Sequence, residues 1–189
     1  MKQTQDEKLY HIGKSPFGTF ILLWSVAQHE PKIMQVILPN PVRISEKIYR
    51  TLLSREIEKS CSEIDRMAAQ ITSVLEGERQ QFSLDSVRLD LCPEFQQRVL
   101  RAEFQIPYGY VTHYKRLAIH LGHPNASRAV GNALSNNPFP IIIPCHRAVR
   151  SDFSVGGFQG GEVMKRSLLS FEGNEFNDKK RIKNPRLFY

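Results

Sequence analysis

Residues 141 to 147 read Ile141-Ile142-Ile143-Pro144-Cys145-His146-Arg147, an apolar run that ends in a thiol with an imidazole beside it. The apolar run predicts a buried strand that Pro144 ends, so the thiol should lie where the chain leaves the core. A thiol reacts as its thiolate, and a neighbouring histidine is a common base for forming one. Cys145 is therefore the candidate nucleophile, and the alternative is an inert buried thiol.

The composition is that of an ordinary globular protein. The chain has 189 residues, of which 41% are hydrophobic and 24% charged. No apolar stretch approaches the roughly 20 residues that span a bilayer, and the polar first eight residues do not resemble a secretory signal. The three widely spaced cysteines, Cys61, Cys92 and Cys145, favour reduced thiols. We therefore expect a cytoplasmic protein, or a nuclear one in a eukaryote.

The net charge is +7, from 26 basic and 19 acidic side chains. A basic chain favours a polyanionic partner, because each phosphate contact releases counterions. On charge alone, however, a soluble basic surface is the preferred interpretation. The basic cluster at 179–183 could contact nucleic acid, but a solvated and partly disordered chain end is the simpler interpretation.

The first half of the chain predicts a small α/β unit. Residues 17–27 and 32–38 are rich in β-forming side chains and are separated by His29-Glu30-Pro31, which predicts a hairpin. Apolar residues then recur every three to five positions over 44–75. This spacing predicts one long amphipathic helix, ended by Gly77.

Cys61 lies on the apolar face of that helix, which indicates core filling rather than chemistry. Apolar and polar residues alternate over 82–91, which predicts an extended segment with an interruption at Ser86. Residues 78–92 are therefore the expected connection between two domains. The predicted division is an N-terminal α/β domain with linker at 1–88, a C-terminal domain at 89–173 that contains Cys145, and a basic tail at 174–189.

The second half predicts short helices. One covers 93–104, and two more run from Thr112 to Leu121 and from Asn125 to Leu134, each capped by its first residue. The last two are joined by Gly122-His123-Pro124 and resemble a helix-turn-helix, whose second helix usually docks on DNA. Most helix pairs are only packing units, so this pattern alone does not establish DNA binding.

Seven elements in order make the chain resemble a known family, the O6-alkylguanine-DNA alkyltransferases, also called methylated-DNA–protein-cysteine methyltransferases. The resemblance is strong from about 89 to 173 and weaker in the first half. The elements that carry it are Phe95-Gln96, Ile106-Pro107-Tyr108-Gly109, Tyr114-Lys115-Arg116-Leu117-Ala118, Ser127-Arg128-Ala129-Val130-Gly131, Asn137-Pro138, Pro144-Cys145-His146-Arg147 and Phe171-Glu172-Gly173.

This resemblance implies an α+β fold, with an N-terminal RNase H-like α/β domain that has a small sheet and a long helix. A mostly α-helical domain with a winged-helix-like helix-turn-helix follows. The implied activity is direct DNA repair, in which O6-alkylguanine is flipped out of the duplex and its alkyl group moves irreversibly to Cys145. The implied partner is double-stranded DNA containing O6-alkylguanine, bound by a monomer that needs no cofactor.

The resemblance also implies roles for individual catalytic residues. His146 would take the thiol proton through a water, and Glu172 would steady the imidazolium. Tyr114 would reach the purine N3, and Asn137 would tie the helix-turn-helix to the active-site loop. Judged without the family, Glu172 could be just a charge at the C-terminal end of a helix, and Tyr114 would more often be a core or interface aromatic.

Arg128 resembles the family's arginine finger, which replaces the extruded base from the minor groove. Without the family it would be a surface arginine. Phe158 stands where tyrosine is common, and Ser135 where a basic residue is common. The small residues that would let this helix approach DNA are Ala126, Ser127, Ala129 and Gly131. The implied substrate pocket comprises Leu134, Ala148, Gly156, Gly157, Phe158 and Gln159, with the amide of Gln159 facing O6.

No metal site is expected, because His11, His29 and Cys61 lack the spacing of zinc ligands. Two other functions remain open. A non-catalytic alkyl-lesion-binding protein of the same fold would lack the cysteine, so Cys145 stands against it. A cysteine hydrolase or thiol oxidoreductase would call for a CxxC pair or a second acid–base dyad, and the sequence contains neither.

Overall fold

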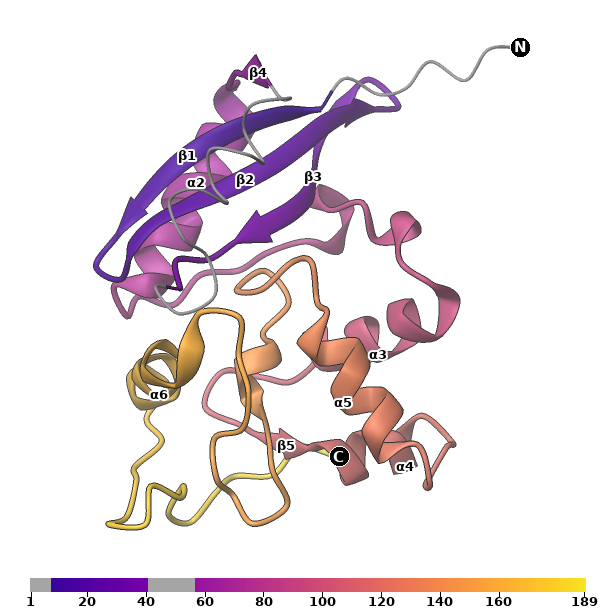
Figure 1. Ribbon diagram of the computed structural model, residues 1–189, viewed down its shortest axis with the longest axis vertical. Coiled ribbons are helices and arrows are strands. Elements are labelled where there is room, and N and C mark those ends of the chain that lie inside the picture. Colours follow the sequence, from indigo (N-terminus) through magenta and orange to yellow (C-terminus); the bar gives the residue numbers. More distant parts are fainter. Residues whose placement is uncertain (1–7, 41–56) are drawn as a thin grey trace.

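The computed structural model describes residues 8–40 and 57–189 and is shown in Figure 1. Over these ranges the protein is a mixed α+β structure, with a small sheet in its N-terminal part and most of its helices in its C-terminal part. The predicted α+β class is confirmed at this level. None of the described helices is long and apolar enough to cross a membrane.

The N-terminal sheet has the strand order β3-β2-β1-β4, and both β1–β2 and β2–β3 are antiparallel. The predicted hairpin is confirmed as β2–β3. Its turn lies at Gln28 and His29, whose positive φ angles of 53° and 69° are those of a two-residue hairpin loop. The sequence reading missed β1. The strands are β1 (Leu9–Ser15), β2 (Gly18–Ala27), β3 (Glu30–Ile37) and β4 (Ile57–Glu58).

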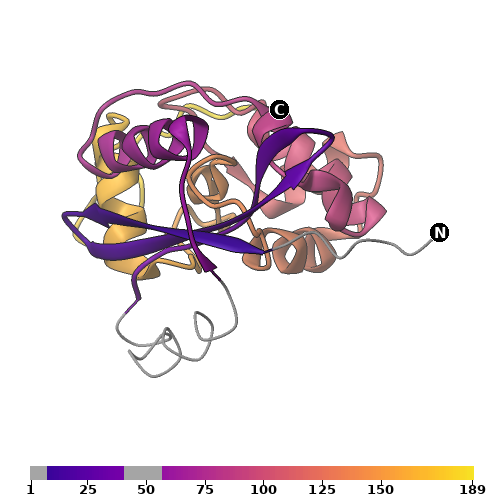
Figure 2. The same cartoon turned by 90° about the horizontal axis from the view of Figure 1, so that it is seen from above.

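Helix α2 (Ser62–Leu75) lies along one face of the sheet, as Figure 2 shows, and buries Ile64, Ala68, Ile71 and Leu75 against it. Gly77, with φ of 99°, follows its end as predicted.

The prediction of one helix over 44–75 is wrong for residues 57–61, which the structure describes and which precede α2. Residues 57–58 pair with β1 as strand β4, and Cys61 is the N-cap of α2 rather than a residue of its apolar face. The thiol of Cys61 still packs against the core. Apolar spacing cannot separate a short strand from the helix that follows it. Residues 44–56 lie outside the described ranges.

The extended segment predicted over 82–91 is also wrong. Two short 3-10 turns, η1 (Leu84–Ser86) and η2 (Leu89–Leu91), occupy most of it, and Val87 between them forms a bridge to Ile33. The hydroxyl of Ser83 accepts a hydrogen bond from the Asp85 amide. Such side-chain bonds favour a local turn over an extended chain.

In the C-terminal part, the predicted helix over 93–104 is confirmed as α3. The next two helices exist, but both predicted caps are wrong. Thr112 belongs to a short strand paired with Ala148, and the cap of α4 is His113, whose Nδ1 accepts from the Arg116 amide at 3.2 Å. Asn125 precedes α5, whose N-cap is Ala126. The elements are α3 (Glu94–Phe104), β5 (Thr112–His113), α4 (Tyr114–His120), α5 (Ser127–Ser135), η3 (Cys145–Arg147), β6 (Ala148–Val149) and α6 (Gly161–Phe171).

The apolar run at 141–143 is buried as predicted, but it is not a strand. Ile141 has a φ of 74°, and the Ile143 amide donates to the Phe139 carbonyl at 2.8 Å, which closes a tight loop. Pro140 and Pro144 bracket the run. Since neither proline has an amide to donate, a continuous ladder through this segment is disfavoured.

A single buried cluster extends from the sheet to the helices, including Phe20 of β2, Leu100 of α3 and Ile143. Edge strand β3 also bonds to the C-terminal part, where the Val36 amide donates to the Pro138 carbonyl at 2.7 Å. The sheet therefore supports the loop that leads to Cys145. The domain boundary after residue 88 and the RNase H-like and winged-helix descriptions remain predictions.

The C-terminal segment is folded, so its interpretation as a partly disordered end is wrong. Ile182 is buried and forms a bridge with Phe176, and Leu187 forms one with Val111. The hydroxyl of Tyr189 donates to the Ala102 carbonyl at 2.8 Å. Apolar residues spaced between the charges hold this segment against the body of the protein.

Candidate active site

Cys145 lies in the 3-10 turn η3 and is 8% exposed. It opens onto a cavity of about 280 Å³ that lies between α5, the start of α4 and the chain around residues 150–158. The thiol is therefore reachable through a defined opening rather than sealed in the core. The residues that line this cavity are Tyr114, Gly131, Asn132, Leu134, Ser135, Cys145, Arg150, Gly157 and Phe158.

Burial raises the pKa of the Cys145 thiol to about 11, although the Asn137 side-chain amide acts to lower it. At neutral pH the resting group is thus a protonated thiol, because removing its proton would leave a charge in a poorly solvated place. The site consequently needs a base that takes this proton as the reaction proceeds.

His146 and Glu172 form a buried pair, with 2.9 Å between Nε2 and Oε1. Arg147 also binds this carboxylate, through Nε at 3.0 Å and a terminal nitrogen at 2.7 Å. Burial acts to raise the pKa of Glu172, but His146 and Arg147 outweigh it and lower the pKa to about 2. Glu172 is therefore ionised, and a carboxylate only accepts, so His146 donates through Nε2–H.

The other ring nitrogen of His146, Nδ1, is buried and has no hydrogen-bond partner. Burial lowers the pKa of His146, although Glu172 acts to raise it. The ring is accordingly neutral near pH 7, with a free lone pair on Nδ1. Cys145 and His146 are consecutive in η3. Thiol, neutral base and orienting carboxylate thus occur together, which is the set that activates a nucleophile.

Asn137 follows α5 and holds the loop that leads to Cys145. Its Nδ2 donates to the Ile143 carbonyl at 3.1 Å, and its Oδ1 accepts from the Phe139 amide at 2.9 Å. One buried side chain thus satisfies two backbone groups of a tight loop. This contact joins the end of the helix pair to the cysteine turn.

Tyr114 is the first residue of α4 and lines the cavity beside Cys145. Burial raises the pKa of its hydroxyl, so the group is protonated and can donate a proton. Gly156 packs against this hydroxyl, since a Cβ at that position would lie 3.1 Å from the oxygen. With φ of 71°, Gly156 also occupies a conformation that favours glycine.

Three of the predicted pocket residues line the cavity, namely Leu134, Gly157 and Phe158. The other three, Ala148, Gly156 and Gln159, are not among its lining residues. The Gln159 side chain instead accepts from the Leu38 amide at 2.7 Å and donates to the Val36 carbonyl at 3.3 Å. That side chain fastens the chain next to the pocket to the end of β3.

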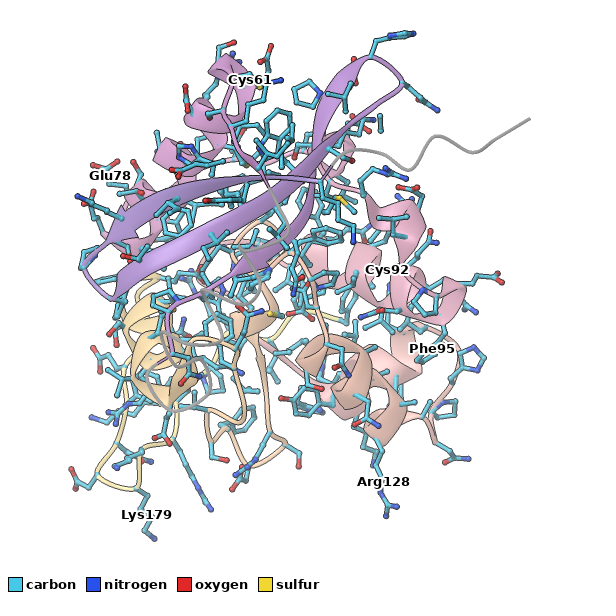
Figure 3. The ribbon with its side chains drawn as sticks, turned by 45° about the horizontal axis from the view of Figure 1, so that its top comes forward. Cys61, Glu78, Cys92, Phe95, Arg128 and Lys179 are labelled. Atoms are coloured by element: carbon cyan, nitrogen blue, oxygen red, sulfur yellow. The ribbon has the colours of Figure 1, made fainter. Side chains whose placement is uncertain are left out.

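Arg128 lies near the start of α5 and is exposed, and Figure 3 shows its side chain directed away from the protein. Ala129 is exposed beside it, Ala126 and Ser127 are half-buried, and Gly131 lines the cavity. The outer face of α5 therefore combines one long cation with small side chains and leads directly to the opening above Cys145.

Sequence reasoning missed two buried ionisable groups near the cysteine. Lys165 of α6 is fully buried and donates to the Ala148 and Gly157 carbonyls at 2.7 and 3.1 Å; burial lowers its pKa to about 8. Glu103 of α3 is also fully buried, and neither carboxylate oxygen has a hydrogen-bond partner. Burial raises the pKa of Glu103 to about 8. Charges on helices usually face solvent, so the sequence carried no signal for either burial.

Across residues 8–40 and 57–189, no group of three or more His, Cys, Asp or Glu side chains is placed to hold a metal ion.

The chain is similar in sequence and in fold to known proteins. Residues 94–174 match the family model described as the 6-O-methylguanine DNA methyltransferase DNA-binding domain. A methylated-DNA–protein-cysteine methyltransferase of Methanothermobacter thermautotrophicus is 40% identical over 110 residues. That alignment covers 58% of this chain and 61% of the relative, so the chain spans less than two thirds of the length of this curated relative.

Solved structures extend the match to both parts of the chain. Mycobacterium tuberculosis OGT in complex with DNA is 31% identical, with a TM-score of 0.67, over 87% of this chain and 92% of that one. The chain belongs to the O6-methylguanine methyltransferase family. A second structure, that of M. tuberculosis O6-methylguanine methyltransferase, also matches with a TM-score of 0.67, at 29% identity over 88% of this chain and 92% of that one.

Proposed function

We propose that this protein repairs DNA by flipping O6-alkylguanine out of the duplex and transferring its alkyl group irreversibly to Cys145. The observation that carries the proposal is a thiol that lines a cavity, with the neutral base His146 next to it in the chain and the ionised Glu172 bonded to that base. Membership of the O6-methylguanine methyltransferase family supports the same conclusion. The protein is consumed in one turnover, because a thioether at Cys145 cannot return to a thiol under mild conditions.

The chemistry is a displacement at the alkyl carbon. As His146 Nδ1 takes up the thiol proton through a water, the sulfur forms a bond to carbon and the bond between carbon and guanine O6 breaks. The electron pair of that bond stays on guanine, which leaves as an anion unless it gains a proton. Tyr114 supplies that proton from its hydroxyl at the purine N3 and regains one from the imidazolium through solvent. Overall, the thiol proton ends on guanine.

Substrate delivery depends on the outer face of α5. A base in a stacked duplex cannot reach a thiol inside a cavity, so the nucleotide must rotate out of the helix. Arg128 fills the space that the base leaves, and the small residues Ala126, Ser127, Ala129 and Gly131 let α5 approach the minor groove. Leu134 and Phe158 form apolar walls for the base and its alkyl group.

The proposal also covers the partner, the location, the domain division and the remaining residues of the site. The partner is double-stranded DNA carrying O6-alkylguanine, and a monomer acts on it in the cytoplasm, or in the nucleus of a eukaryote. The chain is divided into a domain at 1–88, a catalytic domain at 89–173 and a tail at 174–189. Asn137 holds the loop before Cys145, while the backbone of Ala148, Gly156, Gly157 and Gln159 borders the bound base.

The test is an intact-mass measurement after mixing the protein with duplex DNA that contains O6-methylguanine. We expect one added methyl group per chain, lost in Cys145→Ala and retained in Cys92→Ala, which removes another buried cysteine. A second function, that of a non-catalytic lesion-binding protein, would give tight binding with no change in mass. A methyl group that persists in Cys145→Ala would exclude the proposed nucleophile.

A further inference from the structure

The C-terminal turn (residues 175–183) is built onto the loop at residues 150–154. Ser154 and Arg181 form an antiparallel bridge, and the Ile182 amide donates to the Phe153 carbonyl at 3.1 Å. Arg181 and Asp152 add an ion pair at 3.0 Å. Two segments that are far apart in sequence therefore form one structural unit.

Hydrogen bonds within this unit define the backbone of the turn that carries its lysines. The side chain of Asn177 accepts hydrogen bonds from the amides of Lys179 and Arg181, both at 3.0 Å, so the turn is closed from within. Ile182 anchors it from below and is 4% exposed, in a cluster with Val149. Lys179 and Lys180 are exposed at the tip. A rigid support lowers the entropy cost of using these side chains in binding.

The unit borders the opening above Cys145. Arg150, the first residue of the 150–154 loop, lines that cavity on one side, while Gly131 and Leu134 of α5 line it on another. Figure 3 shows Arg128 and Lys179 projecting from the same end of the molecule. A duplex that lies on α5 with one nucleotide in the cavity therefore extends toward the C-terminal turn.

We propose that the C-terminal turn is a second contact with the DNA backbone, in which Lys179 and Lys180 bind phosphates next to those held by α5. This inference rests on the proposed function, because it assumes that DNA occupies the opening above Cys145. The nearby acid Asp152 is neutralised by Arg181. Glu175 and Asp178 are exposed on the same turn, so the attraction depends on the two lysines at its tip.

The experiment measures the affinity of the full chain for duplex DNA containing O6-methylguanine, over a range of salt concentrations. Affinity falls as salt rises, and each lost phosphate contact should make the slope of log affinity against log salt less steep by about 0.9. We expect Lys179→Ala/Lys180→Ala to make the slope less steep by about 1 to 2 and to weaken binding about tenfold at low salt. Lys179→Arg/Lys180→Arg should keep the wild-type slope.

The matched control is Lys14→Ala/Lys59→Ala, which removes the same charge from two exposed positions, one in β1 and one directly after β4. An equal change in slope for this control and for the turn variant would overturn the inference, since it would show only an effect of net charge. An unchanged slope in a turn variant with a wild-type melting temperature would overturn it as well. If the wild-type protein itself binds no DNA, the proposed function fails first.

Discussion

Two buried glutamates near the cysteine have pKa values that are shifted in opposite directions. Glu172 is bound by His146 and Arg147, and these partners lower its pKa to about 2. Glu103 is completely buried, neither of its carboxylate oxygens has a partner, and burial raises its pKa to about 8. At neutral pH the first is therefore a charged anchor, and the second is mainly an uncharged acid.

The pKa values of the two glutamates differ because Glu172 has hydrogen-bond donors around it and Glu103 has none, although both side chains are buried. A buried carboxylate is stable where donors replace the water it has lost, and it otherwise holds a proton. Lys165 and Arg147 act to lower the pKa of Glu103, but no ion pair within 4 Å joins Glu103 to either cation in the described structure. The arrangement thus favours charge on the side of His146, where the proposed reaction needs it.

Replacing Glu172 should have the largest effect. Glu172→Gln removes the charge that orients His146 and leaves Arg147 without its buried counterion, which should cost about 3–5 kcal/mol of unfolding free energy. The rate of alkyl transfer should fall on the order of 100-fold. Denaturant unfolding and single-turnover kinetics measure the two losses. Glu175→Gln is the exposed control, and a similar loss in that variant would contradict the role of Glu172.

Glu172 should also determine part of the loss of folding stability at acid pH. Because the pKa of Glu172 is lower in the folded protein than its ordinary value of 4.5, its contribution is present above pH 4.5 and is lost as pH falls toward 2. Wild-type stability should therefore fall more steeply over that range than the stability of Glu172→Gln. Parallel curves would show that the carboxylate gains nothing from its partners.

Asn137, like Glu172, is a buried polar residue whose side chain has hydrogen-bond partners, but it carries no charge. Asn137→Ala leaves the Ile143 carbonyl and the Phe139 amide without their buried partner, which should cost about 2–3 kcal/mol. The loop before Cys145 should loosen, so amide hydrogen exchange at Phe139 should accelerate. Asn136→Ala changes an exposed neighbour at the end of α5 and serves as the control. Equal exchange rates in the two variants would remove the positioning role.

The sequence predicted the role of Glu172 but not the burial of Glu103. The Pro-Cys-His-Arg box and the Phe-Glu-Gly element named Cys145, His146 and Glu172, because these residues belong to short motifs that carry the family resemblance. Glu103 and Lys165 belong to helices with ordinary amphipathic patterns. A pattern reports which face of a helix is apolar, and it does not report a polar residue placed on that face.

The errors in the fold have a related cause. The hairpin and α3 were predictable from local spacing alone. The run at 141–143 predicts a strand because its burial is visible in the sequence, whereas its tight turn is fixed by Asn137 and by neighbouring prolines. The fold of the C-terminal segment depends on contacts with residues 102–111 and 153, which lie too far away along the chain to form a local signal.

The smallest expected effect is a gain of stability when Glu103, the buried glutamate without hydrogen-bond partners, is replaced. Glu103 has a higher pKa in the folded protein than its ordinary value of 4.5, so it lowers stability as pH rises from 4.5 toward 8, where the unfolded chain releases the proton and the folded chain retains it. Glu103→Leu removes this dependence. Its advantage over the wild type should be small at pH 5 and reach about 1–2 kcal/mol near pH 8.

Denaturant unfolding at pH 5, 7 and 8 measures this advantage, with Glu103→Gln as a second variant that removes the titration but keeps a polar group. Arg101→Leu, an exposed change on the same helix, controls for added hydrophobicity. A loss of stability that grows with pH in Glu103→Leu would show that Glu103 is ionised and paired with Lys165 in solution. The two glutamates would then both be charged anchors, and the contrast between the two sides of Cys145 would disappear.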